Sequence, residues 1–173
     1  GVSAIVLALL PLVCDGRFPS FEELHERLFG VAYDESNFMI TNFSNPYGLV
    51  PNIRDYGHSN MVPAVFGDII ETFEPEHVQF VVEVGSLFGH SALTMGTVLD
   101  NARLKEVPVL CVDPWTGDLN MWLNYDKDPD VRRWVRHIDG RMTTFDQFMV
   151  NVKLAIENWK MSPKHILPFQ TTS

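Results

Sequence analysis

The chain has little positive charge and little cysteine. Its 173 residues include 13 Lys and Arg against 22 Asp and Glu, for a net charge of -9. Such a chain repels a phosphate backbone, which argues against nucleic acid as a partner. A local basic cluster remains at Arg132, Arg133 and Arg136, where we expect a solvated face. Cys14 and Cys111 are far apart, which excludes a disulfide framework and a cysteine-type metal site and favours a reducing compartment.

Several familiar sequence signatures are also missing. The chain has no internal repeat, no Gly-x-Gly-x-x-Gly and no Gly-Lys-Ser/Thr, which argues against the usual dinucleotide and triphosphate loops. Its longest apolar run, residues 2–13, is too short to span a bilayer comfortably and has no basic leader. We expect this run to be a packed helix or a protein-binding segment rather than a targeting remnant. A cytoplasmic or organellar location is therefore favoured over secretion.

Residues 1–60 are predicted to form an irregular N-terminal extension. Ser20-Phe-Glu-Glu23 fits a capping box and predicts a short helix through Leu28. Residues 42–60 are rich in Asn, Pro and Gly, which indicates a long surface loop. The remaining residues, 61–173, are expected to form a single domain.

From residue 61 the apolar pattern becomes regular. It predicts helices over residues 63–73, 91–102 and from Thr144, where Gln147 would complete a second capping box. Asp128-Pro129 predicts a further helix start. Short apolar strands are expected at residues 79–84, 108–112 and 165–169. This alternation predicts an α/β fold with a Rossmann-like, doubly wound parallel sheet.

The chemistry-bearing residues stand at the ends of the first two predicted parallel strands. Glu83 ends the first strand and is followed by Gly85 and Gly89, which permit a sharp turn and leave room for a ligand beside the backbone. Asp113 ends the second strand, where an acid can accept hydrogen bonds from ribose hydroxyls. Because Glu83 places negative charge beside the turn, a nucleoside carrying an ammonium and a sulfonium fits better than a phosphate.

These residues resemble those of class I S-adenosylmethionine-dependent methyltransferases. Glu83-Val-Gly-Ser-Leu-Phe-Gly-His-Ser91 is similar to the motif I variant of small-molecule O-methyltransferases, with Leu87 replacing the middle glycine of the commoner loop. Val112-Asp-Pro-Trp-Thr-Gly-Asp118 resembles a segment of the macrocin O-methyltransferase-like branch, and residues 145–152 resemble the helix that follows it. The resemblance covers residues 63–173.

The resemblance implies a cofactor, S-adenosyl-L-methionine, and a role for each matching residue. Its methionine portion would be held by Glu83, Gly85, Ser86, Gly89 and Ser91. Asp113 would bind the ribose, Trp115 would lie near the adenine, and residues 171–173 would approach the adenine edge. The catalytic base is not identified.

The family continues beyond this point with further strands and an acid-rich loop. A sheet ending at Ser173 would leave its first strand as a bare apolar edge, which promotes aggregation. We therefore expect the rest of the methyltransferase fold, or another chain, to complete the sheet. An exposed first strand would argue against this fold.

Other conspicuous residues are expected to have structural rather than chemical roles. His90 could touch substrate but is expected to be a surface or capping group, and His58 a solvated loop residue. No metal site is predicted, because Asp118, Asp126, Asp128 and Asp130 lack the glycine and glutamate of a calcium loop. The tryptophans at 122, 134 and 159 are expected to anchor a core or an interface.

Two rival functions stay open beside methyl transfer to an oxygen of a small-molecule substrate. One is a nicotinamide-dinucleotide-binding Rossmann domain. The other is a catalytically silent methyltransferase-like domain that serves as a structural or docking subunit of a larger assembly or homo-oligomer, with the apolar N-terminus as a site for a protein partner. An occluded crevice beside Gly85 and Asp113 would favour this docking subunit.

Overall fold

A computed structural model describes residues 4–6, 19–52, 62–73, 78–117 and 119–171. Its strands are β1 (Ala4–Val6), β2 (Val81–Val84), β3 (Val109–Asp113), β4 (His137–Ile138), β5 (Arg141–Met142) and β6 (Ile166–Gln170). Its helices are α1 (Phe21–Phe29), α2 (Met39–Asn42), α3 (Pro63–Thr72), α4 (His90–Asn101), α5 (Leu119–Asn124), α6 (Pro129–Trp134) and α7 (Thr144–Trp159), with the 3-10 helix η2 (Pro163–His165) before β6.

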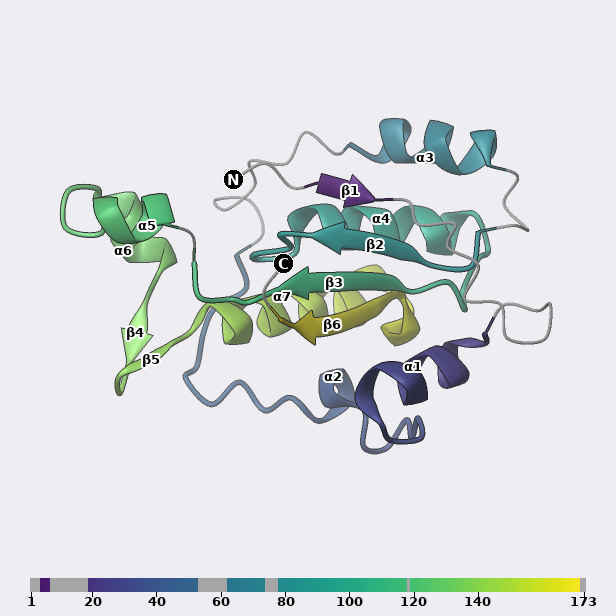
Figure 1. The fold of residues 1–173 in the computed structure, drawn as a ribbon, viewed down its shortest axis with the longest axis horizontal. Helices are drawn as coiled ribbons and strands as arrows, with labels where there is room; N and C mark the ends of the chain where they lie inside the picture. The colour runs from purple at the N-terminus through teal and green to yellow at the C-terminus, as the bar shows by residue number, and fades with distance from the viewer. Residues whose placement is uncertain (1–3, 7–18, 53–61, 74–77, 118, 172–173) are drawn as a thin grey trace.

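The centre of the fold is a sheet with the order β1-β2-β3-β6. Strands β2, β3 and β6 are parallel, and each follows its neighbour through a helix, α4 or α7. Figure 1 shows α4 and α7 behind the sheet, so both crossovers run on the same face. The predicted mixed α/β fold with a parallel sheet is confirmed, and this arrangement is compatible with a Rossmann-like fold.

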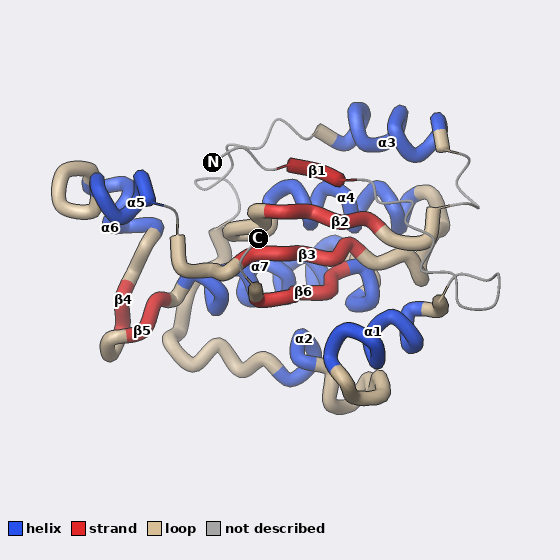
Figure 2. The backbone as a smooth tube through the Cα atoms, in the orientation of Figure 1, coloured by secondary structure: helices blue, strands red, loops and turns tan. Residues whose placement is uncertain are grey.

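The predicted bare edge of the sheet is covered by the chain itself. β1 pairs antiparallel with β2, with Ala4 opposite Val84 and Val6 opposite Val82. Residues 4–6 are therefore a strand, and the expectation of a helix there was wrong. Residues 4–6 thus supply β2 with a hydrogen-bonding partner at this edge, and β1 is the outer strand of the described sheet (Figure 2).

The two faces of the parallel sheet are buried to different extents. On one face, alternate side chains of β2 and β3 such as Val81, Val109 and Cys111 are fully buried. The alternate residues Val82 and Leu110 are only partly buried against the core. On the same face, Leu167 of β6 is fully buried, and the ring of Phe169 lies 6.1 Å from that of Phe29 in α1, so this face is covered at β6 and less so at β2 and β3. Double winding stays a prediction.

The two predicted capping boxes have different outcomes. At α1, Ser20 and Glu23 form the box, because the Ser20 hydroxyl accepts from the Glu23 amide while the Glu23 carboxylate accepts from the Ser20 amide. α7 begins at Thr144 as expected, but its box is wrong: Thr143 is the N-cap residue, and no side chain caps the helix. The Thr144 hydroxyl instead donates to the Trp115 carbonyl.

The segment between β3 and α7 projects to one side of the sheet and contains α5, α6 and the short β4–β5 hairpin (Figure 1). α6 begins at Pro129, which confirms the predicted helix start. Trp122 and Trp159 are exposed, at 43% and 47%, so they do not anchor the core of this chain. The side chain of Trp134 lies outside what the structure describes.

Candidate functional site

The loop between β2 and α4 turns sharply through three residues with left-handed backbone conformations. Gly85 and Gly89 both have φ of 85°, and Leu87 has φ of 44°. Leu87 therefore adopts a conformation that usually favours glycine, at the position where the commoner methyltransferase loop has one. Gly89 ends the loop as the N-cap of α4, and a Cβ there would lie 3.0 Å from the Phe148 ring. The predicted turn is present and tightly packed.

Glu83 lies at the bottom of this loop with no exposed surface. The Ser91 hydroxyl, from the first turn of α4, donates a hydrogen bond to Glu83 Oε1. Within the described part of the chain, Glu83 Oε2 and the Ser86 hydroxyl are buried and make no hydrogen bond of normal geometry. Burial raises the pKa of Glu83, while the nearby Ser86 and Ser91 hydroxyls act in the opposite direction. The loop thus covers a carboxylate with unused acceptor capacity.

Asp113 joins the end of β3 to this loop. Its Oδ2 accepts from the Leu87 amide at 2.9 Å, and its Oδ1 accepts from the Trp115 amide at 2.6 Å. The side chain is nearly buried, and burial raises its pKa while the two amide donors oppose the rise. Each carboxylate oxygen can accept more than one hydrogen bond, so the predicted ribose contact is still chemically possible.

Trp115 is part of the core. It is 2% exposed, its indole Nε1 donates to the Leu87 carbonyl at 2.7 Å, and its ring packs against Phe145 and Phe148 with centroids 5.0 Å away in each case. The backbone of Leu87 is therefore held at both polar groups, by Asp113 and by Trp115. The predicted position of Trp115 beside an adenine stays a prediction.

Asn151 of α7 is a site residue that the sequence analysis missed. It is fully buried, and its Nδ2 donates to the Phe88 carbonyl at 2.9 Å and to the Asn52 carbonyl at 3.1 Å. Its Oδ1 accepts from the Asn52 amide at 2.8 Å. Gln147, one turn earlier, donates to the Val50 carbonyl and to Asn151. The signal available in the sequence was a pair of amide side chains, Gln147 and Asn151, spaced four residues apart beside the apolar stripe of this helix.

The remaining predicted residues have less definite places. His90 begins α4, and its buried Nδ1 has no hydrogen-bond partner among the described residues. The Thr171 amide donates to the Asp113 carbonyl at 3.2 Å and extends the β3–β6 ladder. His58, Asp118 and residues 172–173 lie outside the described residues. In the described ranges, no three His, Cys, Asp or Glu side chains gather in a way that could hold a metal ion.

In comparisons with known proteins, no protein-family model, curated protein or solved structure matches this chain. No helix in the described segments has the length and apolar character needed to cross a membrane.

Proposed function

We propose that this chain binds S-adenosyl-L-methionine and transfers its methyl group to an oxygen of a small molecule. In this proposal the parallel sheet is the first half of a doubly wound methyltransferase fold. Glu83, Gly85, Ser86, Gly89 and Ser91 would hold the methionine portion, and Asp113 and Trp115 would form the nucleoside side of the site. The support is the arrangement of the β2–α4 loop together with the sequence motifs.

One observation carries the proposal. Glu83 Oε2 and the Ser86 hydroxyl are polar atoms buried without a hydrogen bond of normal geometry to any described residue, and the neighbouring Gly85 is exposed. A buried polar group without a partner costs about 1–3 kcal/mol, so such atoms are uncommon in a finished fold. An ammonium group could satisfy both atoms after a small shift of the loop, and a phosphate would be repelled by the carboxylate.

When bound, S-adenosyl-L-methionine would supply a methyl activated by its sulfonium, and in-line attack of the substrate oxygen on that methyl would release S-adenosylhomocysteine. The contribution of this chain would be alignment, because the Leu87 backbone is fixed by Asp113 and Trp115 before any ligand arrives. The substrate hydroxyl also has to lose its proton. Among the described residues, the candidate for the base that accepts this proton is His90, because it directly follows the β2–α4 loop as the first residue of α4.

The test is calorimetric titration with S-adenosylhomocysteine and, separately, with a nicotinamide dinucleotide. We expect S-adenosylhomocysteine to bind the wild type. We expect this binding to be lost in Gly85→Val, because the valine side chain would stand in the turn. Gly30→Val is the matched control, because Gly30 also has a positive φ, of 70°, with no atom within 4 Å of an added Cβ. Binding of the dinucleotide alone would overturn the proposal.

A second candidate is a docking subunit that has lost its activity. It is favoured because the residues expected to bind the cofactor already contact other parts of the chain. Both Asp113 oxygens accept hydrogen bonds from backbone amides, and the Trp115 ring packs against two phenylalanines. The same titration separates the two candidates. A folded wild-type protein that binds neither ligand would favour the docking subunit.

A further inference from the structure

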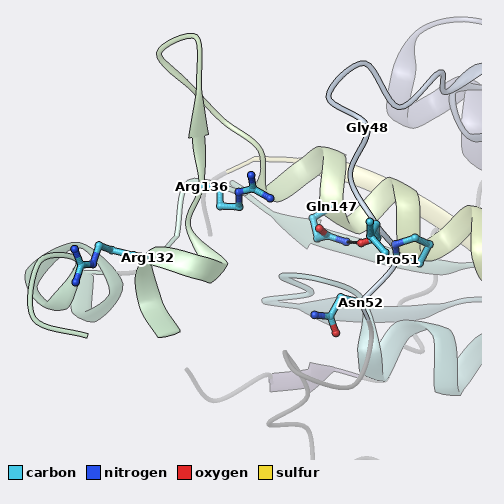
Figure 3. Close-up of a pocket in the computed structure, with 7 residues that line it drawn as sticks. Gly48, Pro51, Asn52, Arg132, Arg136 and Gln147 are labelled. Carbon is cyan, nitrogen blue, oxygen red and sulfur yellow. Dashed lines mark hydrogen bonds between the residues drawn. The ribbon is translucent and has the colours of Figure 1, made fainter. Parts of the chain in front are cut away.

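A cavity of about 330 Å³ lies on the side of α7 that faces the N-terminal extension. This volume is at the lower end of the range for small-molecule sites, about 300–1,000 Å³. It is larger than a single inorganic anion needs. Its lining is drawn in Figure 3 and consists of Gly48, Val50, Pro51, Asn52, Arg132, Arg136 and Gln147.

The charge of this cavity is opposite to that of the whole protein. Among the described residues that line it, two are arginines and none is acidic, although the chain carries a net charge of -9. Within the described part of the protein, neither Arg132 nor Arg136 forms an ion pair. In Figure 3 the Arg136 side chain extends toward Gln147, whereas Arg132 points away from it. Arg136 is therefore the available direct partner for an anion, and Arg132 adds positive potential at longer range.

The cavity is connected to the β2–α4 loop through a single buried side chain. Asn52 and Gln147 form part of its wall, and both are hydrogen-bonded to Asn151. Asn151 in turn donates to the Phe88 carbonyl in the loop. The segment of residues 48–52 is thereby held against α7 close to the proposed cofactor site. A ligand in the cavity would lie next to that site.

We propose that this cavity binds the anionic group, a phosphate or a carboxylate, of the molecule that receives the methyl. Arg136 is exposed at the rim of this cavity, and its planar guanidinium can pair with either anion through two parallel hydrogen bonds. The remaining volume would hold the adjoining organic part against Val50 and Pro51. The role as an acceptor site rests on the proposed function, whereas anion binding itself does not.

The test uses the whole chain with inorganic phosphate and, separately, acetate as probes. Binding is followed by two-dimensional NMR of the backbone amides of Gly48 and Val50 and the side-chain amide of Gln147. Chloride at matched ionic strength controls for screening. Arg136→Met removes the charge and keeps the length of the side chain. Arg141→Met is the matched control, because Arg141 is an exposed arginine of the nearby hairpin that does not line the cavity.

The expected result is a saturable shift of these signals with at least one anion, weakened about tenfold or more in Arg136→Met and unchanged in Arg141→Met. Preference for phosphate or for acetate then identifies the kind of anion. The absence of saturable shifts, or equal weakening in both variants, would overturn the proposal. If S-adenosylhomocysteine fails to bind while the anion result holds, the site stands and the methyltransferase proposal falls.

Discussion

The carboxylate of Asp113 holds the amide of Leu87 at 2.9 Å, and this contact joins the ends of two neighbouring parallel strands. Leu87 stands in a left-handed conformation with φ of 44°, which is unfavourable for a leucine. The contact with Asp113 and the indole of Trp115 together hold it there. The shape of the loop is thus determined by residues about 26 positions away in the sequence.

Replacing Asp113 should show how much this contact contributes. In Asp113→Asn one oxygen becomes an NH2 group, which would face the amide of Leu87 or of Trp115 and leave that buried donor unpaired. We expect the free energy of unfolding to fall by about 1–3 kcal/mol, measured by urea denaturation. Asp68→Asn on the exposed face of α3 is the control and should change little. Equal stability of the two variants would show that the contact is not required.

The buried Glu83 should make stability depend on pH. Burial raises its folded-state pKa, so the folded protein holds this proton more tightly than the unfolded chain does. Its contribution to stability is complete below its usual pKa of 4.5 and is lost as the pH rises through the raised value. Glu83→Gln lacks this loss, so the stability of the wild type relative to the variant should decrease with rising pH.

The measurement is urea denaturation of both proteins at several values from about pH 5 to 8. Glu71→Gln, an exposed residue of α3, shows the effect of removing one negative charge elsewhere. A difference between wild type and Glu83→Gln that stays constant, or that grows in favour of the wild type as the pH rises, contradicts the expectation.

Two glycines inside helices should respond oppositely to alanine. An added Cβ at Gly67 of α3 meets nothing within 4 Å, so Gly67→Ala should stabilise the protein by about 0.5–1 kcal/mol through helix propensity. At Gly96 of α4 the same Cβ would lie 2.7 Å from Met161 Sδ and 3.3 Å from His165 Cβ. Gly96→Ala should therefore destabilise by about 1 kcal/mol or more. The measurement is the melting temperature of each variant relative to the wild type. A change in the same direction for both variants would refute this packing at Gly96.

Lys164 should stabilise the packing of α1 beside the β6 side of the sheet, and this stabilisation should be weaker in high salt. Its Nζ lies 3.0 Å from Glu22 and 2.6 Å from Glu106, and 5.5 Å from the centre of the Phe21 ring. The two carboxylates raise the pKa of Lys164. Because the group is partly solvated, Lys164→Met should cost only about 1 kcal/mol, and less in high salt. Lys105→Met, an exposed lysine, is the control, and an equal loss in both would contradict this stabilisation.

The local elements were predictable because their signals lie close together in the sequence. The capping box at Ser20 and Glu23, the start of α6 at Pro129 and the alternation of strands and helices from residue 61 are all present. The same local rule failed at Thr144 and Gln147. Their side chains bond to Trp115 and Val50, which are distant in the sequence, and those contacts replace the expected box.

The sequence by itself determined which residues stand at the strand ends, because strand periodicity and the glycine positions are properties of neighbouring residues. Only the tertiary structure decided what each one contacts. It made residues 4–6 a strand beside β2, placed the Trp115 ring in the core, and brought Asn151 to the Phe88 carbonyl. An apolar run can pack as a helix or as a strand, and an amide can bond to many partners. The packing of distant segments selects among these outcomes, and no local pattern encodes that choice.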